Sequence, residues 1–161
     1  MSDRAAELVE VLGMMAHPEG GFYRELFRST DAVTPADGRG ERTALTTIYF
    51  LLRAGEHSRL HRVESDEVWH HYEGAPLELV WCPDDFATLH CATLGPVGPD
   101  SRPVEIVPAR HWQAARSTGE YTLVGCTVGP GFDFSDFRML DPSDPAAERL
   151  RAHQPSLVQF L

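Results

Sequence analysis

Hydrophobic positions follow a helical spacing near the start of the chain. Four apolar residues there lie three or four positions apart: Ala5, Leu8, Val9 and Leu12. This spacing predicts a helix over residues 3–15, with Ser2 or Asp3 as its N-cap. The following His17-Pro18-Glu19-Gly20-Gly21 stretch ends the helix, because proline and paired glycines cannot continue it.

From residue 22 onward the pattern changes to short runs of β-branched and aromatic residues, separated by Gly, Pro or Asp. Residues 43–53 (TALTTIYFLLR) are the clearest run, and a polar loop over residues 30–41 precedes them. Strands are predicted over residues 22–29, 43–53, 57–63, 67–72, 77–82, 86–94, 103–107, 112–117 and 121–128. Short strands at this spacing favour a sandwich or barrel.

A second helix is predicted over residues 145–152, with Asp144 as its N-cap and Pro155 as its stop. The chain of 161 residues is long enough to bury a core. We therefore expect a single domain over residues 1–161 that is mainly β, a barrel with a short helix at each end.

Charge narrows the possible partners. The chain has 24 acidic and 14 basic residues, which gives a net charge of −10 with histidine neutral. Phosphate backbones require a positive surface, so nucleic acid is not an expected partner. All basic residues are arginine, and the lack of lysine excludes a P-loop lysine and Schiff-base chemistry on a side-chain amine.

The three cysteines, Cys82, Cys91 and Cys126, are odd in number and lack Cys-x-x-Cys spacing. They are typical of reduced thiols in an intracellular protein. The sequence has no stretch typical of a signal peptide or a membrane span. We therefore expect a cytoplasmic protein with no membrane partner.

Residues 55–74 hold the strongest candidate chemistry. If they form a hairpin-like pair of strands, side-chain alternation places His61 on one inner face and Glu67, Trp69 and His71 on another. His61 and Glu67 would then converge, either to ligate a divalent metal or to transfer a proton without one. The alternative is a surface hairpin whose polar residues are only solvated.

Two segments resemble the signature motifs of the cupin superfamily. The first motif reads Gly, five residues, His-x-His, three or four residues, Glu, six residues, Gly. Its positions are filled here by Gly55, His61, Glu67 and Gly74, with Val63 in place of the second His. In the second motif only Pro108 matches, and the expected Gly, Gly, His and Asn are replaced by Arg102, Arg110, Gln113 and Ser117.

Longer phrases resemble one group within that superfamily, the small single-domain proteins called cupin_5 or DUF985. The phrases are HPEGGFYRE at residues 17–25, SDEVWH at 65–70, YTLVGCTV at 121–128 and PGFDF at 130–134. The resemblance implies a double-stranded β-helix, often dimeric, with a pocket for a small molecule between its sheets. It does not imply a particular reaction, although members have been compared with deoxysugar epimerases of the same superfamily.

The residues that replace the usual motif histidines affect which cofactor we expect. Cupin metal sites usually use three His and one Glu, whereas this chain offers His61, Glu67 and Gln113. One imidazole, one carboxylate and one amide form a weak set for Fe, Zn, Mn or Ni. A metal would need a further ligand such as His70, His71 or His111, so we expect no cofactor, with a divalent metal as the alternative.

Without a metal the same residues suit proton transfer next to a carbonyl. His61 would be the base, Glu67 its orienter or partner acid, and Gln113 would polarise the carbonyl. These roles predict an isomerase, epimerase or lyase. The alternatives are a metal-dependent oxygenase or hydrolase using the same residues, and a small-molecule-binding protein without catalysis.

Four further residues are candidates for substrate binding. Tyr23 would donate a proton and Arg24 would bind an anion, unless the first only packs and the second pairs with a carboxylate. Trp69 and His71 lie on the same face as Glu67, where Trp69 would form the floor of the pocket or belong to the core.

Overall fold

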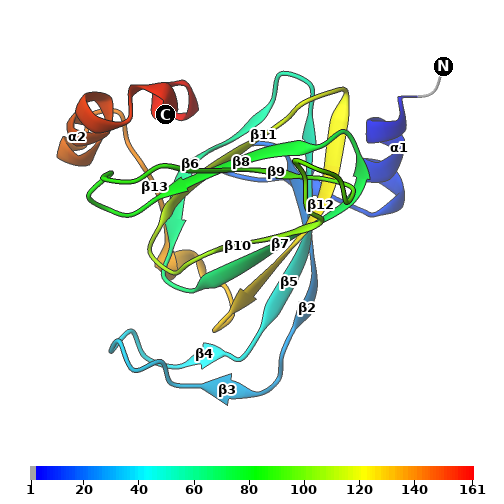
Figure 1. Cartoon of the computed structure of the whole chain (residues 1–161). Coiled ribbons are helices and arrows are strands. Elements are labelled where there is room, and N and C mark those ends of the chain that lie inside the picture. The colour runs from blue at the N-terminus through cyan, green and yellow to red at the C-terminus, as the bar shows by residue number, and fades with distance from the viewer. Residues whose placement is uncertain (1–2) are drawn as a thin grey trace.

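The computed structural model describes residues 3–161, and two antiparallel sheets that face each other form its body (Figure 1). The first sheet has the strand order β1-β2-β5-β12-β7-β10. Its strands are β1 (Met15–Ala16), β2 (Phe22–Arg28), β5 (Thr46–Arg53), β12 (Tyr121–Gly129), β7 (Asp66–Gly74) and β10 (Val104–Val107). This arrangement confirms the mainly β fold with a barrel-like body.

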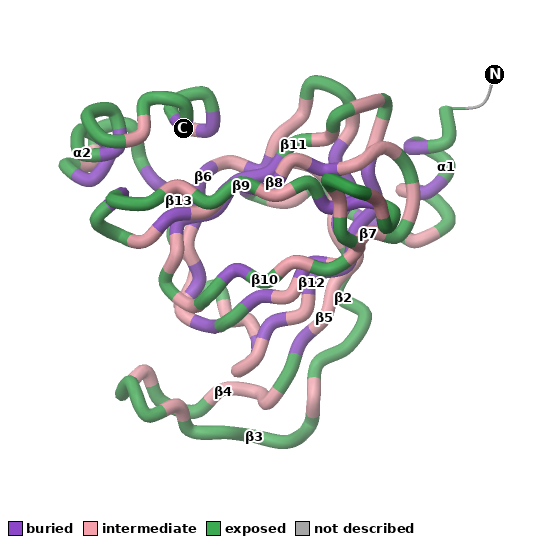
Figure 2. The backbone as a smooth tube through the Cα atoms, in the orientation of Figure 1, coloured by how far each residue is buried: buried purple, intermediate pink, exposed green. Residues whose placement is uncertain are grey.

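The second sheet has the order β13-β6-β11-β8-β9. Its strands are β13 (Phe137–Met139), β6 (His57–Val63), β11 (Trp112–Ser117), β8 (Leu77–Cys82) and β9 (His90–Leu94). A separate hairpin of β3 (Ala32–Val33) and β4 (Arg42–Thr43) extends away from the barrel (Figure 1). This hairpin has no buried residue, whereas buried positions run along both sheets (Figure 2).

Apolar residues fill one part of the space between the sheets. Phe50 and Leu52 from β5 meet Trp69 from β7 and Leu79 from β8, and all four are almost completely buried. Burial of large apolar side chains is the main favourable contribution to folding. We call this set, which also includes Val124 and Cys126, the inner cluster.

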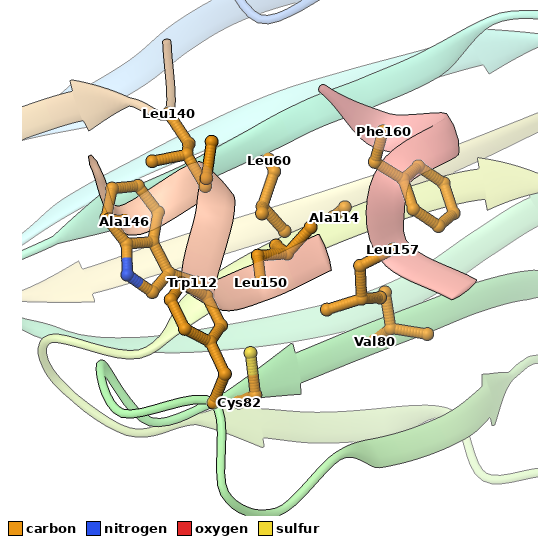
Figure 3. Packing of buried hydrophobic residues seen from close by; sticks show 12 residues of the cluster. Leu60, Val80, Cys82, Trp112, Ala114, Leu140, Ala146, Leu150, Leu157 and Phe160 are labelled. Carbon is orange, nitrogen blue, oxygen red and sulfur yellow. The ribbon is translucent and has the colours of Figure 1, made fainter. Parts of the chain in front are cut away.

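A second set of buried apolar residues, the outer cluster, covers the outer face of the second sheet (Figure 3). There α2 (Pro145–His153) and the 3₁₀ turn η2 (Pro155–Phe160) pack Leu150, Leu157 and Phe160 against Leu60 and Trp112. The predicted helix over residues 145–152 is confirmed, and the side chain of Asp144 caps it by accepting from the backbone N–H of Ala146.

The N-terminal helix α1 (Arg4–Val11) is shorter than the predicted 3–15. Asp3 is its N-cap and accepts from the backbone N–H of Ala6, while Ser2 lies outside the described residues. The helix ends early because Gly13 adopts a φ of 61° and the chain then pairs with β2 as strand β1. No helix within residues 3–161 has the length and apolar character needed to span a membrane.

Several strand boundaries differ from the prediction. Residues 86–89 are not part of a strand, because Phe86 closes a turn with Pro83 and turns inward into the outer cluster. Residues 43–53 divide between β4 and β5, and the short elements β1, β3, β13 and η1 (Phe134–Asp136) were not predicted.

The expected hairpin over residues 55–74 is wrong. Strand β6 pairs with β11 and β13 in the second sheet, whereas β7 pairs with β12 and β10 in the first. The short link between Val63 and Asp66 therefore crosses from one sheet to the other. Consequently the two strands face each other across the interior of the barrel.

Candidate functional site

A pocket of about 300 Å³ lies between the two sheets, beside the inner cluster. Side chains of β2, β5, β7 and β12 line it from the first sheet, and those of β6 and β13 from the second. His17 and Glu19, before β2, and Phe132, Asp133 and Phe134, after β12, complete the lining. Its volume is at the small end of the usual range for ligand pockets.

His61 and Glu67 both line this pocket, from opposite sheets. Only 3% of His61 and 7% of Glu67 is exposed. They approach each other because β6 and β7 turn their inner faces toward the same space. The sequence analysis brought these two residues together through an expected hairpin, which the structure does not contain.

The direct partner of His61 is a residue that the sequence analysis did not assign, Glu19. The Nε2 atom of His61 lies 3.1 Å from Oε2 of Glu19. On the other side of the ring, Nδ1 lies 2.7 Å from the backbone carbonyl of Arg59 and donates to it, because a carbonyl only accepts. Nε2 is therefore the atom of His61 that exchanges a proton with Glu19.

Burial determines the protonation of this pair. It raises the pKa of Glu19 to about 8, even though the Ser58 hydroxyl donates to the carboxyl group. It also lowers the pKa of His61, against the effects of Glu67 and the Arg59 carbonyl. Both shifts favour the uncharged forms, in which the carboxylic acid of Glu19 donates to the neutral imidazole. The pair thus holds one transferable proton near neutral pH.

Glu67 lines the pocket from the opposite sheet, and its side chain is held by a chain of hydrogen bonds from residues outside the lining. The Nε2 atom of Gln113 donates to Oε2 of Glu67 at 2.6 Å, and the indole N–H of Trp69 donates to Oε1 of Gln113 at 3.0 Å. Burial raises the pKa of Glu67, while His61 and the hydrogen bond from Gln113 act in the opposite direction. A carboxylate with a raised pKa is a stronger base than an exposed one.

His17 is a second imidazole in the pocket. Its Nδ1 accepts from the backbone N–H of Glu19 at 3.1 Å, so the neutral ring carries its proton on Nε2. Tyr23, Phe50 and Phe137 surround the ring with their edges or faces. This burial lowers the pKa of His17 to about 4, with a smaller contribution from His61.

The glycine pair after Glu19 explains how an irregular segment reaches into the barrel. Gly20 has a φ of 110°, and a Cβ there would collide with the backbone carbonyl of His57 in β6. The backbone N–H of Arg59 donates to the carbonyl of Glu19 at 2.7 Å. Close packing on β6 therefore directs the Glu19 side chain toward His61.

Of the other predicted site residues, only Tyr23 lines the pocket. Arg24 points to the opposite face of β2 and donates to the carbonyl of Leu12 at 3.0 Å. Trp69 belongs to the inner cluster. His71 lies farther along β7, where its Nε2 is 3.3 Å from the Ala75 carbonyl. Since β7 runs away from the pocket, only Glu67 at its start reaches the pocket.

Gln113 also lies outside the pocket lining. Both ends of its amide are hydrogen-bonded within the protein, one to Glu67 and one to Trp69. In this arrangement Gln113 positions Glu67 and does not offer its N–H groups to a ligand. Its predicted role as the group that polarises a carbonyl requires a different orientation.

The predicted metal ligands do not form a metal site in this arrangement. Both ends of the Gln113 amide are bonded to other side chains, and Val63 supplies no donor atom. Within residues 3–161 no three His, Cys, Asp or Glu side chains are grouped so that they could hold an ion. The expectation that no metal is required stays a prediction.

His17 and Glu19 are the functional candidates that the sequence analysis missed. They stand in the HPEGGFYRE phrase, which was interpreted only as the end of a helix and as part of a resemblance. The available signal was two titratable residues at alternating positions directly before a glycine pair. Their contact with His61 joins residues far apart in the chain, which spacing alone does not indicate.

Comparisons with known proteins agree on the fold. The family model described as Cupin superfamily (DUF985) matches residues 6–140. A protein from Shewanella oneidensis has a similar structure, with 34% identity, a TM-score of 0.83 and coverage of 98% of this chain and 96% of the other. A hypothetical protein from Leishmania major is similar with 29% identity, a TM-score of 0.84 and 96% coverage of both chains.

More distant structures share the fold alone. Oxalate decarboxylase from Bacillus subtilis is 16% identical with a TM-score of 0.58, and the match covers 85% of this chain and 33% of that enzyme. No curated protein matches the chain significantly.

Proposed function

The chain belongs to the DUF985 family of the cupin superfamily, and from this premise we propose that its pocket is the active site of an isomerase, epimerase or lyase for a small carbonyl compound. One observation carries the proposal. Two groups that can exchange protons, the Glu19–His61 pair and Glu67, stand on opposite sheets and line one pocket.

The reaction needs one group to remove a proton and another to supply one. In one direction, Glu67 takes a proton from the carbon next to the carbonyl, and the electrons of that C–H bond form an enolate. The Glu19–His61 pair then donates a proton to the opposite face of the same carbon, which completes an epimerisation, or to a leaving group on the next carbon as that bond breaks, which completes an elimination. Exchange with solvent afterwards removes the proton from Glu67 and restores the one on the pair. In the reverse direction the pair is the base, which is the role predicted for His61.

Raised and lowered pKa values support this division of roles. Burial keeps the Glu19–His61 pair uncharged with a proton to donate, and it raises the pKa of Glu67. General acids and bases work best when their pKa lies near the operating pH. No oxidant or reductant is consumed, because isomerisation, epimerisation and elimination are all redox-neutral.

Hydrogen exchange in heavy water tests the proposal even while the product is unidentified. Purified protein is incubated in D₂O with a panel of carbonyl compounds that carry an acidic α-proton, and deuterium uptake is followed by mass spectrometry. We expect uptake with at least one compound. We expect His61→Gln and Glu67→Gln to slow it by a factor on the order of 10²–10⁴, the usual contribution of a general acid or base.

The matched control is His90→Gln, because His90 lies on β9, stacks on Trp81 and does not line the pocket. Its exchange rate should equal that of the unmodified protein. Exchange that His61→Gln and Glu67→Gln leave unchanged would show that the reaction occurs elsewhere. Saturable binding of a panel compound without any exchange would instead favour the non-catalytic binding protein.

Metal content separates the proposal from the metal-dependent alternative. We would measure Fe, Zn, Mn and Ni by mass spectrometry in protein purified without an affinity tag or chelator. The proposal expects far less than one equivalent and no gain in exchange when metal is added. Near-stoichiometric metal would mean that His61 and Glu67 recruit further ligands, and the proton-transfer assignment would be abandoned.

A further inference from the structure

The charges that line the pocket carry information about its ligand. Resting on the proposed function, we propose that the pocket takes an uncharged carbonyl compound with an apolar body the size of a single ring, and that it rejects carboxylates and phosphates. Three features support this: the pairing of the charged lining residues, the aromatic walls, and an inward imidazole donor.

The arginine of the lining, Arg28, is already neutralised. Its Nε and Nη2 donate to the two carboxylate oxygens of Glu25 at 2.8 and 3.0 Å, and Nη1 donates to the Phe132 carbonyl at 3.0 Å. Asp133, also near this arginine, accepts from the backbone and the hydroxyl of Ser135. Within the described part of the chain, the mouth of the pocket therefore offers no unpaired cation to an anionic ligand.

Within residues 3–161, the inner end of the pocket also offers no unpaired cation. Glu19 is bonded to His61 and Ser58, and Glu67 is bonded to Gln113. Both histidines of the lining are held uncharged by burial, which lowers their pKa values. A carboxylate or phosphate that entered would lose its hydration without gaining a counter-ion, which is strongly unfavourable. A cation could pair with Glu67, whose carboxylate already accepts from Gln113.

Aromatic side chains form much of the remaining surface. Phe132, Phe134 and Phe137 pack edge to face with centroid separations of 5.0 to 6.0 Å. Tyr23 and Phe50 make edge-to-face contacts with the ring of His17. Flat apolar walls of this kind favour a planar ring, through both area and edge-to-face contacts.

The side chain of His17 is a polar group of the lining that can bind the carbonyl oxygen of a ligand. Nδ1 of His17 accepts from the Glu19 backbone, so its Nε2 carries the proton. No hydrogen bond joins this Nε2 to another residue within 3–161. A neutral imidazole N–H is a suitable donor to a carbonyl that becomes an enolate. The donor and the two proton-transfer groups thus lie in the same lining.

Three compounds of nearly equal shape and different charge test the inference: benzamide, benzoate and benzamidinium. Binding to the full-length protein would be measured at pH 7 by ligand-detected NMR and calorimetry. We expect benzamide to bind more tightly than either ion, and the dissociation constant of benzoate to be at least about tenfold higher than that of benzamide, because this anion is desolvated without a counter-ion. Benzamide has no C–H bond on a carbon next to its carbonyl, so this result does not depend on catalysis.

Two variants locate the effect in the pocket. Glu25→Gln leaves Arg28 without its counter-charge and should lower the dissociation constant of benzoate severalfold. Phe134→Ala removes an exposed aromatic wall residue and should weaken benzamide binding, whereas Val97→Ala, at an exposed position away from the pocket, should not.

Benzoate binding as tight as benzamide binding would overturn the inference, and so would tighter binding of benzamidinium, which would indicate a cationic ligand. Failure of all three to bind at millimolar concentration would overturn the ring-sized apolar body. The expected order of affinities together with no deuterium exchange would retain the ligand class and reject only the catalytic proposal.

Discussion

At the scale of single residues, the pocket depends on one carboxylic acid in an unusual setting. Glu19 is almost fully buried, and the imidazole of His61 lies within hydrogen-bond distance of its carboxyl group. A charged Glu19 would be costly there, so the residue keeps its proton far above the pH at which an exposed glutamate loses it.

This protonation should appear in the pH dependence of stability. The folded-state pKa of Glu19 is about 8 against an ordinary value of 4.5, so the folded protein holds a proton that the unfolded chain has released. The stabilisation is complete below pH 4.5 and is lost as pH rises through 8. The opposite contribution of His17, whose pKa falls from 6.5 to about 4, is complete above pH 6.5.

Between pH 6.5 and 8.5 the free energy of unfolding should therefore decrease, and Glu19→Gln should flatten this decrease because glutamine imitates the protonated acid. Denaturation by urea at several pH values measures it. Glu10→Gln is the same substitution at an exposed position of α1 and should keep the slope of the unmodified protein. An unaltered slope in Glu19→Gln would show that Glu19 is ionised in the folded state.

A second residue-scale prediction concerns Arg110, which occupies a glycine position of the second motif. Its φ is 65°, and its backbone N–H bonds the carbonyl of Val63 at 2.8 Å. Left-handed backbone costs a non-glycine residue roughly 1–2 kcal/mol. Its ion pairs with Glu64 and Asp37 are exposed and contribute little.

Arg110→Gly should therefore be more stable than Arg110→Ala by about 1 kcal/mol, because both lose the ion pairs and only glycine relieves the backbone. Equilibrium denaturation of the two variants, side by side, gives the difference. Equal stability of the two would mean that the turn relaxes to another conformation when the arginine side chain is absent.

The sequence was informative about residues wherever a local pattern carried the signal. His61 and Glu67 stand at the spacing of a known motif, and both line the pocket. Glu19 escaped notice because its role depends on a contact between distant segments. Gln113 stands at the His position of the second motif, but the direction of its amide follows its hydrogen bonds with Glu67 and Trp69, which no spacing indicates.

At the scale of elements, the bounds of the strands were easier to predict than which strands pair with each other. The bounds of β6, β8 and β11 agree with prediction, because each is a short run with clear punctuation. The link between β6 and β7 is as short as a hairpin turn, yet it joins two sheets. The amino-acid composition of a link does not distinguish a hairpin turn from a link between two sheets, because both require only a short segment that changes the direction of the chain.

Helix α2 and turn η2 stabilise the second sheet from outside, away from the pocket. Leu150 is fully buried in the outer cluster, so Leu150→Ala should reduce the free energy of unfolding by about 2–5 kcal/mol. Val158 is 40% exposed in η2, and Val158→Ala should have a much smaller effect. Benzamide affinity, measured well below the melting temperature, should be unchanged in both; a large loss would mean that α2 also shapes the pocket.

At the scale of the whole molecule, we expect the protein to form a homodimer. Strands β1 and β10 are the edges of the first sheet, and apolar side chains such as Phe27 and Ile106 are about half exposed. Sheet edges and apolar surface are often covered by a second copy related by a twofold axis. We expect sedimentation velocity to give twice the chain mass of 17.9 kDa, and a species at the single-chain mass over the micromolar range would refute the homodimer.

The pocket and the inner cluster share two residues, Phe50 and Cys126. The floor of the pocket is thus the end of the hydrophobic core, whereas the proton-transfer groups stand on its walls. A shorter side chain in place of Phe50 would deepen the pocket and a longer one would make it shallower, whereas Cys126 contacts Glu67 and is less free to change. Relatives could therefore diverge in the length of the ligand they accept while inheriting one reaction, through single mutations at the floor.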